Sequence, residues 1–439
     1  MTSCVYERPE YRRSRGAYRL FCMLEYFIAL LVSDVYLFKL LTYVGLSDGS
    51  IGIVSSLITV ACLFQLSSIG LVRHIRNVKK WAVTFCLASQ TVFVLLYLLP
   101  FLPLSLPSKT AFAFGGILLG YFFNYAIASI LFQWANSYVD PYRRAVFRAD
   151  KERMSLLGGM LFTLVLGVVV DRFELADRLP GAFALIIAAG LLINAVSLAA
   201  LLCIDGRWNL GAQPEGIPLL HMARALLRNR GFIRVVVLSA LWSCAQYVTL
   251  GFLGSYKSRE LMLSVGTVQL INILGNACRF LLSRPLGRYA DRTSYAQCIE
   301  VALYIAAAAF LCVVLTAPTS RWFIVAFTLL IAVSQAGVAQ NLLNIVYDYV
   351  PAAYFVQASS IRSCVGGLCG FGAALMGGWL LGFVQRRGGR LLGVPLYGQQ
   401  ALAFLSFVLS VAAALYVRFT LRRRPPGGTA AAPCGALRR

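Results

Sequence analysis

The sequence predicts an all-α integral membrane protein with twelve transmembrane helices in two six-helix halves. Three observations lead to this fold class: the composition, the length of the apolar runs and an internal repeat. Of the 439 residues, 59% are apolar and 13% are charged, and the mean hydropathy is +0.75. Average globular proteins are roughly 45–50% apolar and about 25% charged. The composition therefore excludes a soluble globular fold, a disordered chain and a coiled coil.

Twelve apolar runs are long enough to cross a membrane as helices, since a span needs about 20 such residues. The first run follows a basic start without a cleavage site, so we expect it to be retained as a span. The longest internal polar stretch divides six spans from six. We expect an N-terminal bundle (1–204), a cytoplasmic linker (205–230), a C-terminal bundle (231–420) and a tail (421–439). The twelve runs are approximately 18–45, 51–72, 81–103, 110–139, 154–171, 181–204, 232–256, 267–286, 296–318, 322–349, 363–384 and 399–420.

The formal net charge of +23 would suggest a nucleic-acid partner in a soluble protein, but the positions of the basic residues explain it differently. Most of the 40 Lys and Arg residues fall at the two termini and in the segments after every second span. The positive-inside rule places these segments in the cytoplasm, where anionic lipid headgroups attract them. We therefore expect a multi-pass protein of a plasma membrane, bacterial in type, with both termini cytoplasmic and no nucleic-acid partner.

An internal repeat relates the two halves of the chain. A shift of 208 residues places Asn136 on Asn344 and Asp140 on Asp348, and it also superimposes the glycine pairs 158–159 and 366–367. Six spans separate the equivalent positions, so both copies keep the same sidedness. The repeat therefore predicts two bundles related by an axis along the membrane normal.

The segment Gly287-Arg-Tyr-Ala-Asp291-Arg292, between spans eight and nine, resembles the G-x-L-A-D-R-x-G-R-R loop motif of the major facilitator superfamily. The first-half copy starts at Gly70 and has His74 in place of the aspartate. With the twelve spans, the repeat and the central linker, the resemblance covers essentially the whole chain. It implies a transporter that works by alternating access as a monomer.

The motif suggests a gate on the cytoplasmic side. A carboxylate such as Asp291 can accept hydrogen bonds from the amides of a facing helix N-terminus and pair with Arg148 or Arg153. In the superfamily that the chain resembles, such a latch would hold the cytoplasmic ends of the two halves together. The alternative is a static salt bridge that orders the loop. The candidate gate residues are Asp140, Arg148, Arg153, Gly287, Asp291, Arg292 and Asp348.

Ionisable side chains at membrane depth are functional candidates because burying them is costly. The first span carries Glu25 and Asp34. On one continuous helix, nine residues at about 100° each would place them on opposite faces. Desolvation raises the pKa of a buried carboxyl group, so either residue is a candidate for proton coupling. The alternatives are a neutral carboxyl bonded to a neighbouring helix, or an ion pair of Glu25 near the cytoplasmic surface.

Polar stripes recur in spans four and ten. Gln133, Asn136 and Asp140, like Asn341, Asn344 and Asp348, are spaced i, i+3 and i+7 and share one helical face. In the superfamily, spans one, four, seven and ten line the central cavity, so the stripes would line its cytoplasmic half. Either a gate of interhelical bonds or a site for solute hydroxyls fits them. Further candidate pathway residues are Asn124, Tyr125, Trp242, Gln246, Gln335 and Gln340.

The sequence thus predicts a secondary transporter of a small solute, driven by a solute or proton gradient. It contains no Walker A pattern, and neither its cysteines nor its two histidines have the spacing of a metal site. We therefore expect no cofactor, no metal and no enzymatic activity. Two alternatives remain: a sensor or assembly factor built on a transporter fold, and an integral-membrane transferase, which would need clustered carboxylates or histidines.

Overall fold

The structure of the chain is a computed structural model. It describes residues 9–32, 34–46, 61–75, 77–206, 226, 228–253, 256–263, 265–317, 320–386, 390–391, 394–395 and 398–421. This part of the chain is almost entirely helical. Its strands are β1 (Arg390–Leu391) and β2 (Val394–Pro395), which form one short antiparallel pair. The predicted all-α fold class is confirmed.

Nine helices in the described residues are long and apolar enough to cross a membrane, as expected for a multi-pass membrane protein. Each corresponds to one of the twelve predicted spans. They are α6 (Val78–Leu95), which continues as η2 (Leu96–Phe101), α7 (Leu106–Asn136), α8 (Arg144–Leu175), α9 (Leu179–Leu202), α11 (Arg230–Leu250), α14 (Tyr295–Val314), α15 (Trp322–Asn344), α17 (Phe355–Arg386) and α18 (Gly398–Tyr416).

The first predicted span is not one helix. It consists of α2 (Pro9–Leu31) and α3 (Asp34–Val44). The hydroxyl of Tyr97 donates a hydrogen bond of 2.7 Å to the carbonyl of Leu31, which satisfies one of the carbonyls that the end of α2 leaves free. The expectation that Glu25 and Asp34 lie on opposite faces of a continuous helix is therefore wrong, because the break interrupts the helical register.

The other two predicted spans are described as follows. Of the second, the structure describes η1 (Ala61–Leu66) and α5 (Ser67–His74). The eighth lies within α13 (Val265–Arg292), whose apolar stretch is interrupted by Asn272, Asn276 and Arg279. Shorter elements connect the long helices: η3 (Pro141–Arg143), η4 (Tyr256–Glu260), α16 (Val346–Tyr349), η5 (Ala352–Tyr354) and η6 (Val417–Leu421).

Several helices begin at a polar side chain that caps their free amides, as such termini require. Asn77 accepts from the amide of Lys80 at the start of α6. Asn229 accepts from the amides of Gly231 and Phe232 and starts α11. The serine before α14 accepts in the same way, from the amide of Gln297. Short-range polar chemistry thus fixes where these spans start.

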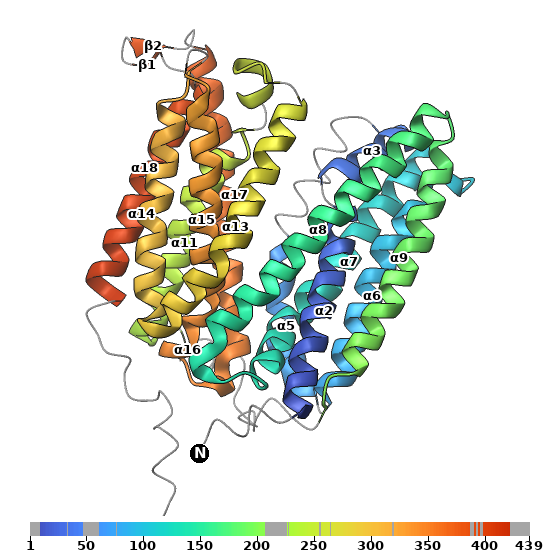
Figure 1. The fold of residues 1–439 in the computed structure, drawn as a ribbon, viewed down its shortest axis with the longest axis horizontal. Helices are drawn as coiled ribbons and strands as arrows, with labels where there is room; N and C mark the ends of the chain where they lie inside the picture. The colour runs from blue at the N-terminus through green and yellow to red at the C-terminus, as the bar shows by residue number, and fades with distance from the viewer. Residues whose placement is uncertain are drawn as a thin grey trace, which may run out of the picture. The chain divides into compact units, whose positions relative to one another are not determined.

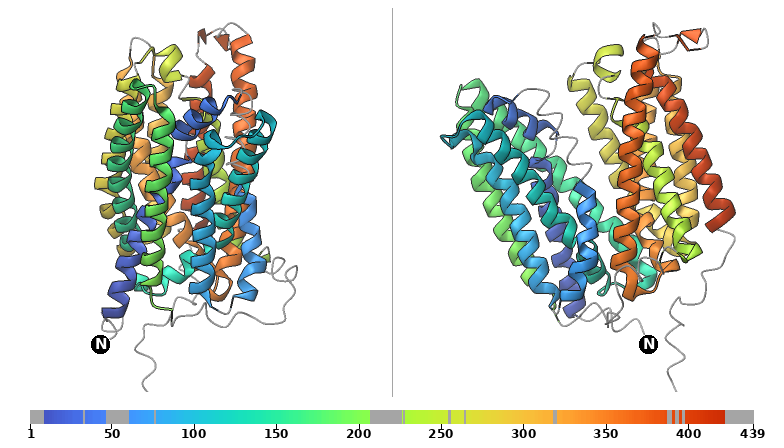
Figure 2. Two further views of the ribbon diagram at one scale, coloured as in Figure 1. Left: turned by 90° about the vertical axis from the view of Figure 1, so that its right-hand side faces the viewer. Right: turned by 180° about the vertical axis from the view of Figure 1, so that it is seen from behind.

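The chain forms two compact units. Unit 1 comprises residues 1–141 and 154–217, and unit 2 comprises residues 142–153 and 218–439. Helix α8 runs as one continuous ribbon (Figure 1), and its first residues, up to Arg153, belong to unit 2 while the rest belongs to unit 1. Within each unit the long helices lie side by side along their length, as the two views of Figure 2 show.

In unit 1, α6 packs against α7 and α9, and α2 packs against α9. The core includes Ile28, Phe93, Tyr97 and Phe183, all buried. One end of the unit gathers basic side chains on helix termini: Arg15 donates to the carbonyl of Tyr138 and Lys79 donates to the carbonyl of Leu202.

In unit 2, α11 packs against α17 and α18, and α14 packs against α15 and α18. Small residues permit close approaches between these apolar helices. A Cβ atom added to Gly337 on α15 would lie 2.6 Å from the Cβ of Ala302 on α14. Helix α13 packs on α15 and carries several of the charged groups described next.

Candidate functional site

The candidate site begins where the first turns of α8 meet the C-terminal half of α13 in unit 2. The two backbones approach closely at Gly287, which the loop motif contains. A Cβ atom there would lie 2.9 Å from the carbonyl oxygen of Ala145 and 3.1 Å from the Cβ of Ala149. Glycine at this position therefore lets the two helices touch.

Asp291, one turn further along α13, binds the start of α8. Its Oδ1 accepts from the amide of Ala145 at 3.1 Å, and its Oδ2 accepts from the amide of Val146 at 3.0 Å. Both amides belong to the first turn of α8, where backbone donors lack partners within the helix and the helix dipole is positive. The carboxylate thus caps a neighbouring helix in the manner that the motif predicts.

A partly buried ion pair follows two turns into α8. Glu152 on α8 forms an ion pair with Arg279 on α13. The second carboxylate oxygen of Glu152 accepts a hydrogen bond of 2.5 Å from Gln340, and Arg279 donates one of 3.2 Å to Gln335. The side chains of Glu152 and Arg279 are only 14% and 24% exposed. Three helices of unit 2, α8, α13 and α15, are therefore joined by one polar network.

A second, more exposed set of charges flanks this network. Asp150 lies 3.3 Å from Arg284 of α13 and 4.0 Å from Arg153. The guanidinium of Arg153 also lies 4.5 Å from the centre of the Phe280 ring, a cation–π distance. The ion pair expected of Arg153 is thus made with Asp150 and not with Asp291. Surface pairs of this kind contribute little individually, so the buried pair and the helix cap are the stronger contacts.

Asp348 has no basic residue close to it in the sequence. In the structure, Arg144 is the cation that acts on it. The guanidinium of Arg144 also lies 4.4 Å above the Tyr347 ring. Arg144 belongs to the first turn of α8, and Tyr347 to the short helix α16, so this cation–π contact adds to those that hold the start of α8 in unit 2. Arg292 is exposed, and Asp140 is half-buried just before η3.

The amide stripes on α7 and α15 are buried. Asn341 donates to the carbonyl of Gly337 at 2.8 Å and to the sulfur of Cys298 at 3.3 Å. Asn344 is 1% exposed, and neither its oxygen nor its nitrogen has a hydrogen-bond partner in the described part of the chain. Gln133 and Asn136 are buried on α7 in unit 1.

The remaining candidates lie apart from this network. In unit 1, Asn124 of α7 donates a hydrogen bond of 3.1 Å to Oε1 of Glu25 on α2, a bond that both a carboxylate and a neutral carboxyl group can accept. Tyr125 stacks on Tyr121, one turn away. The backbone of Asp34 begins α3, and its side chain lies outside the described residues. In unit 2, α11 carries Trp242, which is buried, and Gln246, which is half-buried.

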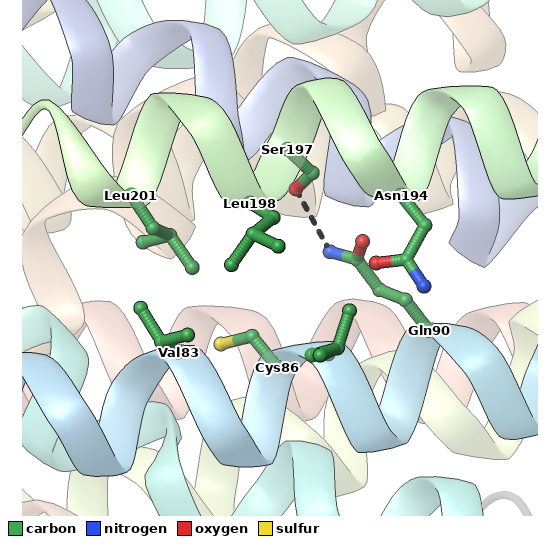
Figure 3. Close-up of a pocket in the computed structure, with 8 residues that line it drawn as sticks. Val83, Cys86, Gln90, Asn194, Ser197, Leu198 and Leu201 are labelled. Carbon is green, nitrogen blue, oxygen red and sulfur yellow. Dashed lines mark hydrogen bonds between the residues drawn. The ribbon is translucent and has the colours of Figure 1, made fainter.

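A small hollow between α6 and α9 in unit 1 is not a solute site. In Figure 3, Gln90 of α6 donates a hydrogen bond of 3.2 Å across the hollow to Ser197 of α9, and Asn194 lies beside them. The hollow does not admit a water-sized sphere. Buried amides and hydroxyls commonly join transmembrane helices in this way, so we interpret these residues as packing contacts of unit 1.

Sequence analysis missed Glu152, Arg279 and Arg284 as members of the network. The signal was present for Arg279, which is a charged residue inside a predicted span and therefore a functional candidate. The ionisable candidates that the sequence predicts at that depth are the carboxylates Glu25 and Asp34. Glu152 gave no such signal, because it lies in a segment rich in charges.

Comparisons with solved structures show which fold the chain has. The chain resembles the fucose:proton symporter of E. coli at 12% identity, with a TM-score of 0.69 over 94% of this chain and 98% of the other. It is similar to a bacterial homologue of the iron transporter ferroportin (14% identity, TM-score 0.67, 94% and 98% covered) and to the human organic anion transporter MFSD10 (15%, 0.63, 93% and 100%). The sequence matches no family model, and no curated protein matches it.

The chain therefore has the fold of the major facilitator superfamily, as the loop motif and the repeat predicted. It is a multi-pass membrane protein of that fold.

Proposed function

We propose that the chain is a secondary transporter that moves a small solute across the membrane by alternating access, and that the contacts of α8 with α13 and α15 form its cytoplasmic gate. The observation that carries the proposal is the pair of hydrogen bonds from the start of α8 to Asp291, in a fold shared with transporters. The end of unit 2 that holds this cap is then the cytoplasmic end.

The gate follows from the path of α8. Its first turns are held in unit 2 by Asp291, Glu152 and Gly287, while the rest of the same helix belongs to unit 1. A rocking motion that carries α8 with unit 1 has to break these contacts. A hydrogen bond to a charged group contributes about 1.5–3 kcal/mol, so the cap and the buried pair bias the two states without locking either.

We further propose Glu25 as the residue that binds a coupling proton, with Asp34 as the second candidate. Glu25 is half-buried on α2, and Asn124 donates to one of its oxygens. The donated bond fixes the orientation of the carboxyl group at this depth of the unit. The Glu25→Gln variant is expected to lose flux driven by a pH gradient and to keep solute counterflow.

The gate is tested by replacing the capping carboxylate. In Asp291→Asn a neutral amide offers one acceptor oxygen where the carboxylate offers two, and about 2 kcal/mol of capping energy is lost. That loss shifts a two-state equilibrium roughly 30-fold. We expect changed flux in proteoliposomes and faster labelling of a cysteine introduced at Ala145, on an otherwise cysteine-free chain.

The matched control is Asp177→Asn, because Asp177 is an exposed loop residue with φ 53°, a conformation that asparagine adopts as readily. Equal flux and equal labelling in Asp291→Asn and Asp177→Asn would overturn the gate. If Asp291→Asn and Asp177→Asn behave alike but both still transport solute, the gate is contradicted and the transport proposal is not.

A further inference from the structure

A charged residue that the gate does not use lies inside the span formed by α17. Arg362 donates from Nη1 to Oγ of Ser239 at 3.2 Å and from Nη2 to Oγ of Ser363 at 2.9 Å. Its Nε is buried and makes no hydrogen bond. Within the described part of the chain, no carboxylate lies within ion-pair distance of this guanidinium.

The charge that acts on Arg362 is positive. It is that of Arg148, which belongs to the first turns of α8 and to the same unit. Buried charges in proteins are normally paired, because the transfer of an unpaired charge out of water is costly. Two guanidinium groups that repel each other raise that cost further. An anion bound at Arg362 would offset this cost.

Hydroxyl groups complete the surroundings of Arg362. Gly366 lies one turn further along α17, and a Cβ atom on it would lie 2.8 Å from Oγ of Ser239 and 3.2 Å from Oγ of Ser243 on α11. Ser239 accepts the Arg362 hydrogen bond with its oxygen, so its own proton remains available to donate. Guanidinium forks and hydroxyl donors together are the chemistry that recognises carboxylates and phosphates.

We propose that Arg362, together with Ser239 and Ser363, binds the oxyanion group of a small solute, a carboxylate or a phosphate. This inference rests on the proposed transport function and names the substrate class. The solute is then an organic anion or phosphate itself. Neither the loop motif nor the amide stripes contribute a residue to this site.

The test is ligand-induced stabilisation of the full-length protein in nanodiscs of zwitterionic lipid, with inorganic phosphate, acetate and succinate as probes and glucose as the uncharged control. At least one oxyanion is expected to raise the melting temperature of the wild type in a saturable way. Arg362→Gln is expected to weaken that binding at least tenfold, and Arg362→Lys to lose less because it keeps the charge without the fork. Arg418→Gln, an exposed arginine outside the site, is expected to bind as the wild type does.

Three results would overturn the inference: no response to any oxyanion, an equal response in Arg362→Gln, or a response to glucose alone. If Arg362→Gln does not fold, Ser239→Ala serves in its place, with an expected loss of a few-fold and the same contrary outcomes. Stabilisation by anionic lipid alone, abolished in Arg362→Gln, would assign the site to a lipid headgroup and overturn the proposal that it binds a solute.

Flux assays separate this inference from the transport proposal. Oxyanion binding without flux of any solute would contradict transport and leave the site in place. Flux of an uncharged solute without oxyanion binding would contradict the oxyanion site and support the transport function.

Discussion

Replacing Gly287 by alanine tests the close contact on which the candidate gate depends. The added Cβ atom would lie 2.9 Å from the carbonyl oxygen of Ala145 and 3.2 Å from its carbonyl carbon. These are backbone atoms of α8, so no flexible side chain can give way. Overpacking of this kind costs about 1–3 kcal/mol. Helices α8 and α13 must separate, and the bonds of Asp291 to α8 lengthen with them.

Helix propensity opposes this cost, because alanine is favoured over glycine by about 1 kcal/mol inside a helix. The matched control is Gly372→Ala on α17, where no atom lies within 4 Å of the added Cβ. This variant gains the helix propensity of alanine without a steric clash of the added Cβ atom. The two variants should therefore differ in unfolding free energy by about 1–3 kcal/mol, with Gly287→Ala the less stable.

The assay is unfolding in mixed micelles by titration with SDS, followed by tryptophan fluorescence and extrapolated to zero denaturant. The transport assay is run on the same preparations, and Gly287→Ala is expected to change flux while Gly372→Ala does not. Equal unfolding free energies for the two variants would refute the contact between α13 and the start of α8.

Three further predictions follow from single contacts. Arg279→Gln leaves the partly buried Glu152 charge without its ion-pair partner and should lower stability by about 1–3 kcal/mol. The double variant with Glu152→Gln should lose much less, and additive losses in this cycle would show that the pair is not coupled. Burial lowers the pKa of Lys257 from its ordinary value of 10.5. Between the folded pKa and 10.5 the unfolded chain therefore binds more protons than the folded chain, and the stability of the wild type rises with pH. The melting temperature of Lys257→Met should lack that rise across this range, and a slope equal to that of the wild type would contradict the assignment. Tyr97→Phe removes the donor to the Leu31 carbonyl at the end of α2 and should cost about 1 kcal/mol in the same unfolding assay, whereas no measurable loss would mean that water replaces the hydroxyl.

The position of Asp291 could be predicted from sequence because the information is local. Gly287 and Asp291 are four residues apart, so both face the same neighbour on any helix. A carboxylate beside a close-approach glycine needs donors, and a helix N-terminus supplies them. The contact could therefore be predicted from the loop motif that this short segment resembles.

The pair of Glu152 and Arg279 could not be predicted in the same way. Their pairing depends on the register between α8 and α13, which are more than a hundred residues apart in sequence. Composition and periodicity contain no information on that register. What the sequence did offer was a charged residue inside the eighth predicted span, Arg279, and another directly before the eleventh, Arg362; both make part-buried polar contacts in the structure.

The break in the first predicted span could be predicted only in part. No proline or glycine interrupts 18–44, so the hydropathy pattern predicts one helix. A serine directly before Asp34 is nonetheless typical of a helix start, because short polar side chains cap free amides. The buried Tyr97 hydroxyl then supplies the donor that the preceding helix end requires. The end of α2 at Leu31 and its bond from Tyr97 depend on a tertiary contact, which a hydropathy pattern does not contain.

Solute-driven flux in sealed proteoliposomes tests the central claim most directly. Pools of sugars, amino acids, nucleosides and small organic anions are added outside, and uptake and internal pH are recorded for the wild type and for Glu25→Gln. The account predicts saturable, protein-dependent flux with at least one pool, accompanied by a pH change that Glu25→Gln abolishes. Absence of flux from every pool, together with no stabilisation of the protein by any of them, would contradict a transporter and favour a sensor or assembly factor built on the same fold.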